Sequence, residues 1–115
     1  MNLIKVVLNS RKGEHYAEGI YDNGKLTVIK NSKLNPNMAI YYYSAAKNII
    51  AIRENRELVN NEGIVIKDII FNSPSTAAQF VTGRSVNGFI SWRPDDKMSL
   101  RDYLRQEKKN EQTNC

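Results

Sequence analysis

The amino-acid sequence predicts an α+β fold, with a mainly antiparallel sheet on which one long helix and two shorter helices pack. Asn23-Gly24 lies between two stretches rich in strand-forming residues, as in a β-hairpin. A helical spacing of apolar residues runs through 37–62 without a glycine or a proline. Ser73-Pro74 then begins a shorter apolar stretch that ends at Gly83, a pattern typical of a capped helix.

The chain has 115 residues, which suits a single domain with one core. We expect this domain to span residues 1–105 and a mobile polar tail to follow at 106–115. No apolar stretch approaches the roughly twenty residues that cross a bilayer, so no membrane-embedded segment is expected. Cys115 is the only cysteine, which excludes a disulfide within the chain and favours a cytoplasmic setting.

The strands are predicted from short apolar or β-branched stretches that end at turn residues. Residues 3–8 form the first strand, and Tyr16–Asp22 and 25–30 form the hairpin around the Asn-Gly pair. Both residues of that pair tolerate positive φ, which matches the twist of paired strands. Residues 64–66 and 69–71 predict one bent strand or two short strands that extend the same sheet.

The later helices are predicted from their caps and apolar faces. Gly63 follows the long helical stretch as its expected stop. In the helix that begins at Pro74, Ala77, Phe80 and Val81 share one face, which should pack on the sheet.

Asn87-Gly88 predicts a second tight turn, followed by a short last strand at 89–92. Ser99, with Asp102 three residues later, resembles a capping box and marks the start of the final helix. Tyr41, Tyr42 and Tyr43 in the long helix cannot all face one side, so at least one of them should be exposed.

No residues suggest a catalytic site. His15 is the only histidine, whereas zinc sites usually recruit several His or Cys ligands. Gly19-Ile20-Tyr21 spells half of the GIY-YIG nuclease signature, but the required Tyr-Ile-Gly occurs nowhere in the chain. Asp95 with Glu107-Lys108-Lys109 imitates a metal-dependent nuclease pattern, yet this Glu-x-Lys would lie at a helix end instead of on a central strand. We therefore expect a protein that is not an enzyme and that holds no metal or cofactor.

Positive charge is concentrated toward the C-terminus. The chain carries a net charge of +5, and the stretch 84–109 contains seven basic residues against four acidic ones. A basic surface favours polyanionic partners. We predict contacts with nucleic acid, DNA favoured, through donors in the loop after the helix that begins at Pro74, directly after the last strand and along the final helix: Arg84, Ser85, Asn87, Arg93, Arg101 and Arg105.

Two other interpretations of these residues stay open. The arginines can be ordinary solvated charges on an amphipathic helix. Asn87-Gly88 can serve only the turn, and Arg84 can serve only to hold the loop between helix and strand. Trp92 and Phe89 could stack on a base, but aromatic residues on a short strand more often complete a core.

The stretch from Ser73 to Trp92 resembles a known bacterial family, the domain of unknown function 4357. The resemblance rests on Ser73-Pro74-Ser75, Ala77-Ala78, 81–85 and Asn87-Gly88 followed by an aromatic residue. It extends over about residues 16–104, from the Gly19-Ile20-Tyr21 hairpin to the Asp96-Lys97 turn and beyond. Two positions depart from the family pattern: Asn31 stands where the family usually has glycine, and Phe89 stands where it usually has tryptophan.

The resemblance implies a domain often found at the C-terminal end of GIY-YIG nucleases or beside restriction-modification genes. It therefore favours a non-catalytic accessory domain that binds nucleic acid. Phosphate contacts from Arg84, Arg93, Arg101 and Arg105, about four in number, predict a log-log salt slope of roughly −3.6. The alternative is a protein-interaction module of a restriction or defence system. Such a module would use the tyrosines of the long helix and the sheet face to dock a separate nuclease or methylase subunit.

Overall fold

The computed structural model describes residues 3–37 and 44–113, with the side chains of 3–37 and 47–107. These parts form an α+β domain, which confirms the predicted class. Within the described ranges the elements are β1 (Ile4–Asn9), β2 (Tyr16–Asp22), β3 (Lys25–Val28), α1 (Ser44–Glu54), β4 (Ile69–Phe71), α2 (Pro74–Thr82), α3 (Gly88–Ser91) and α4 (Leu100–Thr113).

The four strands form one antiparallel sheet in the order β1-β2-β3-β4. The predicted hairpin joins β2 to β3, with Asp22 opposite Lys25. Asn23 and Gly24 both have positive φ, 47° and 91°, as a two-residue turn of this kind requires. The hairpin prediction is therefore confirmed.

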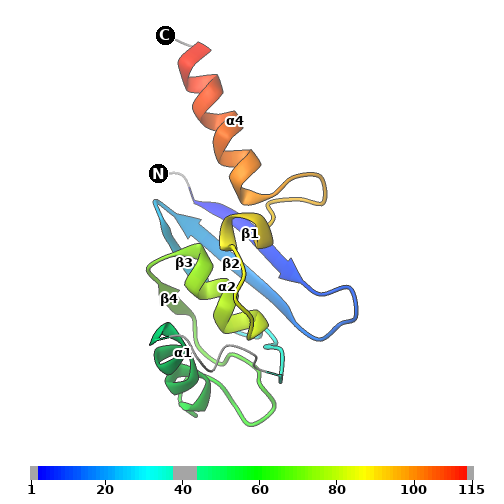
Figure 1. The fold of residues 1–115 in the computed structure, drawn as a ribbon, viewed down its shortest axis with the longest axis vertical. Helices are drawn as coiled ribbons and strands as arrows, with labels where there is room; N and C mark the ends of the chain where they lie inside the picture. Colours follow the sequence, from blue (N-terminus) through cyan, green and yellow to red (C-terminus); the bar gives the residue numbers. More distant parts are fainter. Residues whose placement is uncertain (1–2, 38–43, 114–115) are drawn as a thin grey trace.

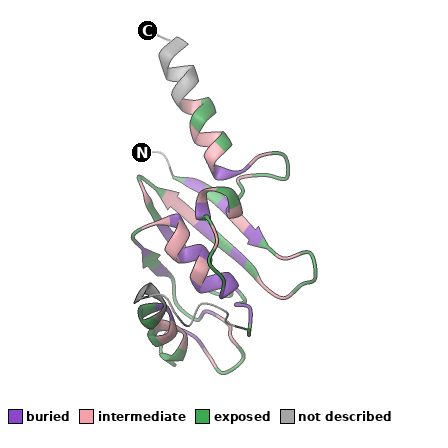
Figure 2. Ribbon diagram, viewed as in Figure 1, coloured by how far each residue is buried: buried purple, intermediate pink, exposed green. Residues whose placement is uncertain are grey.

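One face of the sheet is buried beneath α2 (Figure 1). Alternate strand residues, among them Val6, Leu26 and Phe71, point into the core. Phe80 of α2 meets Phe71 with ring centroids 5.0 Å apart. Buried residues follow the strands and α2, whereas the described parts of α1 and α4 are mostly exposed or intermediate (Figure 2). The opposite face of the sheet is called the outer face below.

Helix α2 has the caps that its sequence predicts. The Ser73 Oγ accepts a hydrogen bond from the Thr76 N–H at 3.1 Å, and Pro74 occupies the first turn. Gly83 ends the helix in the left-handed conformation, with φ of 71°. Asn31 also has positive φ, 77°, so this asparagine adopts the left-handed conformation, which asparagine tolerates better than most residues do.

The prediction of one long helix over 37–62 is wrong, because α1 ends at Glu54. Side chains of asparagine compete with the helix for backbone donors beyond that point. The Asn55 Oδ1 accepts from the Glu57 N–H at 3.0 Å, and the Asn60 Oδ1 accepts from two further backbone N–H groups. The chain therefore turns back toward β4 although no proline interrupts it. Residues 38–43, which include the three consecutive tyrosines, lie outside the described residues.

The predicted strand at 89–92 is also wrong, because these residues fold into the short helix α3. Asn87 has φ of −85°, so Asn87-Gly88 is not the tight turn that the sequence predicts. The Asn87 Oδ1 instead accepts from the Phe89 N–H at 2.9 Å and caps the helix.

The remaining elements follow the prediction in part. The stretch 64–66 makes only isolated bridges, in which Ile64 pairs with Lys33 and Val65 with Val59. The Ser99 Oγ accepts from the Asp102 N–H at 3.2 Å, as expected at the start of the final helix. Helix α4 continues through residues 106–113 of the predicted tail and projects along the long axis of the molecule (Figure 1). Among the described helices, none is long and apolar enough to cross a membrane.

Candidate binding surfaces

The residues of the Ser73–Trp92 stretch hold α2 and α3 together. The Gly88 N–H donates to the Ser75 Oγ at 3.0 Å, and the Trp92 Nε1–H donates to the Pro74 carbonyl oxygen at 3.0 Å. A Cβ on Gly88 would overlap the backbone of Pro74 and Ser75. Only glycine therefore fits where the two helices meet. These four residues, Pro74, Ser75, Gly88 and Trp92, are called the clasp.

The indole of Trp92 also explains the glycine of Gly19-Ile20-Tyr21. Trp92 is fully buried, and a Cβ added to Gly19 would lie 3.1 Å from its Cζ3 and 2.9 Å from the Leu26 Cδ2. Gly19 thus makes room in β2 for the indole ring.

Arg53 connects the end of α1 to the C-terminus of α2. Its Nε and Nη2 donate to the Phe80 carbonyl at 2.9 and 2.6 Å, and its Nη1 donates to the Asn35 carbonyl at 2.6 Å. A cation at this place satisfies carbonyls that a helix end leaves unpaired and complements the helix dipole. Our sequence reasoning missed this role, since the only local signal is a basic residue in the last turn of α1.

His15 lies directly before β2 and is half-buried instead of solvated. Its Nδ1 is buried and has no hydrogen-bond partner among the described residues. Burial lowers the pKa of His15, Glu14 raises it, and the charges of Arg53 and Arg84 lower it further. The imidazole is therefore biased toward its neutral form. The described residues contain no group of three or more His, Cys, Asp or Glu side chains that could hold a metal.

The predicted nucleic-acid contacts fall into two groups. Arg84 and Ser85 are exposed directly after α2, at the end of that helix that lies away from α4 (Figure 1). The charge of Arg84 lowers the pKa of His15. The side chain of Asn87 is exposed, but its Oδ1 is used in capping α3. The 83–87 segment runs back alongside α2, so residues near in sequence are separated along the molecule (Figure 1).

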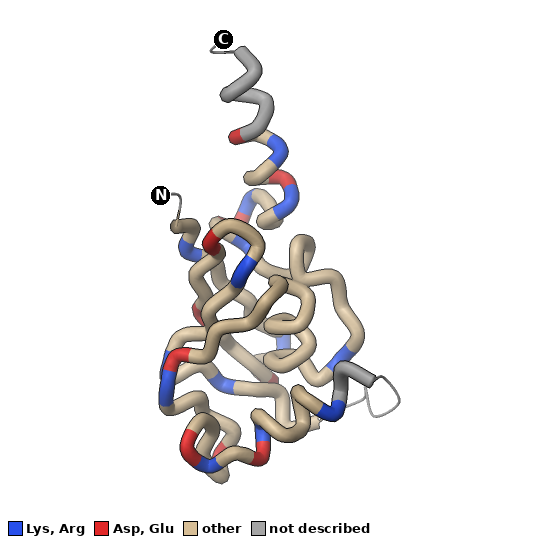
Figure 3. Tube along the Cα trace, turned by 90° about the vertical axis from the view of Figure 1, so that its left-hand side faces the viewer, with Lys and Arg blue, Asp and Glu red and all other residues tan. Residues whose placement is uncertain are grey.

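The second group lies around the base of α4. Arg93 is exposed, pairs with Val7 through its backbone, and donates from its Nη2 to the Asp96 carbonyl at 3.1 Å. Arg101 is half-buried and Arg105 is exposed one turn later. Basic and acidic positions alternate along this part of the chain (Figure 3). The structure therefore does not bring the six predicted residues into one continuous strip.

The outer face of the sheet is only partly covered. Ile20 of β2 lies opposite Thr27 of β3, which lies opposite Ile70 of β4. Ile70 exposes 69% of its surface, while Ile20 and Val7 are half-buried. A shallow hollow of about 360 Å³ lies on this face, and its lining includes Lys5, Val7, Glu18, Ile20 and Ile29. Aliphatic side chains therefore run across a surface that no described helix covers.

Comparison with known families gives a match over residues 7–104 to the family described as Domain of unknown function (DUF4357). Comparisons with curated proteins and with solved structures found no match. The matched range extends from β1 to the first turns of α4 and includes the whole clasp.

Proposed function

Because the chain belongs to the domain of unknown function 4357 family, whose description assigns no activity, we propose a function from its surfaces. We propose that it is a non-catalytic accessory module that binds nucleic acid, DNA favoured, through Arg93, Arg101 and Arg105. The observation that carries this proposal is a projecting helix with two arginines one turn apart and a third, exposed arginine near its base (Figures 1 and 3).

The proposal rests on the length of α4 and on the arginines at its base. Helix α4 has 14 residues and so extends about 21 Å, and a helix of this kind fits the major groove of DNA. Arginine forks suit phosphate oxygens. Four acidic residues interrupt the basic ones between 93 and 107, so we expect weak and salt-sensitive binding. Arg84 is not part of this surface, because it follows the C-terminal end of α2, which lies away from α4 (Figure 1).

Fluorescence anisotropy with labelled duplex DNA, single-stranded DNA and RNA tests the proposal. We expect the variant R101Q/R105Q to bind at least about tenfold more weakly, because two charge-assisted contacts are lost. The matched control is R11Q/K25Q, which removes two charges from exposed hairpin positions. Equal weakening by both variants would mean that only net charge matters, and no binding at low salt would refute the proposal.

A second candidate function is supported by the outer face. There the exposed side chain of Ile70 lies in line with Ile20, and aliphatic surface left in water favours burial against a partner protein. We propose a separate nuclease or methylase subunit as that partner. Mixing the two proteins should give a stoichiometric complex that DNA does not affect and that I20K/I70K abolishes. A complex unaffected by I20K/I70K would refute docking at this face.

We also propose a cytoplasmic location and no catalytic role. Cys115 as the only cysteine suits a reducing compartment. Asp95 and Glu107 are the side chains that most resemble nuclease residues in the sequence. Asp95 accepts the backbone N–H groups of Lys97 and Met98 through its Oδ1, which gives it a turn-forming role. Nuclease activity that D95N or E107Q abolished would contradict the proposal.

A further inference from the structure

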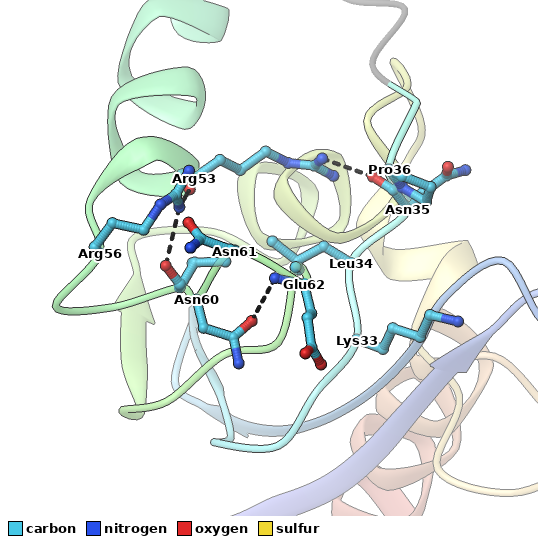
Figure 4. A pocket seen from close by; sticks show the side chains of 11 residues that line it. Lys33, Leu34, Asn35, Pro36, Arg53, Arg56, Asn60, Asn61 and Glu62 are labelled. Atoms are coloured by element: carbon cyan, nitrogen blue, oxygen red, sulfur yellow. Dashed lines mark hydrogen bonds between the residues drawn. The ribbon is translucent and has the colours of Figure 1, made fainter.

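A hollow of about 270 Å³ lies between the segment after β3 and the turns after α1. Leu34, Val59 and Gly63 contribute to its lining. Lys33 and Arg56 lie on opposite sides of it (Figure 4). The hollow is separate from the base of α4 and from the outer face of the sheet. Its lining carries three basic residues, Lys33, Arg53 and Arg56, against one acidic residue, Glu62.

Arg56 is held in place by the backbone beneath it. Its Nη1 donates to the Arg53 carbonyl at 2.9 Å and to the Val59 carbonyl at 3.0 Å. Its Nε and Nη2 have no hydrogen bond to any described residue. These two nitrogens form one edge of the guanidinium, the edge that pairs with two oxygens of a carboxylate or phosphate. The anchored Nη1 reduces the rotamer entropy that binding would otherwise cost.

The neighbouring groups favour a negatively charged ligand. The side chain of Lys33 is exposed and makes no hydrogen bond to a described residue. The Asn60 Oδ1 is occupied by the Glu62 and Ile64 N–H groups at 2.9 and 3.0 Å, which leaves the amide nitrogen as a donor. The negative charge of Glu62 would repel an anion, but its carboxylate points away from Arg56 (Figure 4). Arg53 uses its guanidinium on the carbonyls of Phe80 and Asn35, so its contribution here is a nearby charge.

We propose that this hollow binds an oxyanion, a phosphate or carboxylate group, on the free edge of Arg56. Lys33, whose ammonium points away from Arg56 on the opposite side, contributes a nearby charge (Figure 4). This site is additional to the proposed nucleic-acid surface and does not depend on it. Free inorganic phosphate and a small carboxylate present the same chemistry, and the experiment separates them.

The test is an NMR titration of the full chain with inorganic phosphate and, separately, with acetate, at constant ionic strength and pH. We expect saturable shifts of the amides of 60–64 with a dissociation constant on the order of millimolar. The anion that binds with the lower dissociation constant identifies the ligand class. R56Q should weaken binding at least about tenfold, and E62Q should tighten it about twofold.

Two further variants keep the result interpretable. K33Q leaves every hydrogen bond of the turn intact and should weaken binding about twofold or more, even if R56Q disturbs the fold. R11Q removes a charge from an exposed hairpin position and should bind as the wild type does. Shifts that do not saturate for either anion would overturn the proposal, as would equal affinities of wild type, R56Q and K33Q.

Discussion

Gly88 has no side chain at the place where the backbones of α2 and α3 meet, and this absence allows the clasp to form. Its N–H donates to the Ser75 Oγ, and the buried indole of Trp92 donates to the Pro74 carbonyl next to it. At the scale of the residue, the most distinctive part of the sequence thus has a packing explanation. Asn87 belongs to the same arrangement, because its side chain caps α3.

Gly88→Ala tests this explanation. A methyl group here meets backbone atoms, which cannot move aside as a side chain could. We therefore expect a loss of at least about 2 kcal/mol in the free energy of unfolding, measured by urea denaturation. Ser85→Ala, at an exposed position nearby, is the control and should change stability by less than about 0.5 kcal/mol. A Gly88→Ala protein as stable as that control would show that α2 and α3 can separate freely.

His15 predicts a pH dependence of stability. Its folded-state pKa lies below the value of 6.5 for a free histidine, mainly because of burial. Below about pH 6.5 the unfolded chain therefore takes up a proton that the folded chain excludes, and stability falls as the pH decreases toward the folded pKa. As the pH rises well above 6.5, both states become neutral and this dependence disappears. Urea denaturation from pH 5 to 8 should show the slope in wild type and a flatter profile in His15→Gln; identical profiles would contradict the assignment.

At the scale of the element, local signals predicted the hairpin and α2 because each carries its own chemistry. Asn23-Gly24 fixes a turn, and Ser73-Pro74 with Gly83 fixes both ends of a helix. The errors arose where side chains or distant contacts decide. Helix α1 ends where asparagine side chains accept backbone N–H groups, although no proline interrupts the chain there. Helix α3 depends on contact with α2, which the spacing of residues in the sequence does not reveal.

Asn60 and Asn61 provide a matched pair for the turn after α1. The Asn60 Oδ1 satisfies the Glu62 and Ile64 N–H groups, whereas the side chain of Asn61 is exposed and makes no hydrogen bond to a described residue. Asn60→Ala should lower stability by about 1 to 2 kcal/mol and Asn61→Ala by less than about 0.5 kcal/mol. Thermal unfolding of both variants checks this, and equal effects would remove the proposed role of Asn60.

At the scale of the whole molecule, residues that the sequence places together are distributed over different surfaces. The six predicted nucleic-acid contacts follow one another within about two dozen residues, yet the 83–87 segment separates Arg84 from the base of α4 (Figure 1). Sequence reasoning could find the basic residue types and the helical spacing of Arg101 and Arg105. It could not find the oxyanion hollow at Arg56, which combines segments before and after α1.

The salt dependence of DNA binding decides whether the arginines at the base of α4 contact phosphates. Three phosphate contacts predict a log-log slope of about −2.7 for the wild type and of about −0.9 for R101Q/R105Q, because each lost contact removes about 0.9. Anisotropy of a labelled duplex at several salt concentrations gives both slopes. A wild-type slope near zero, or one that R101Q/R105Q leaves unchanged, would contradict a nucleic-acid surface at the base of α4.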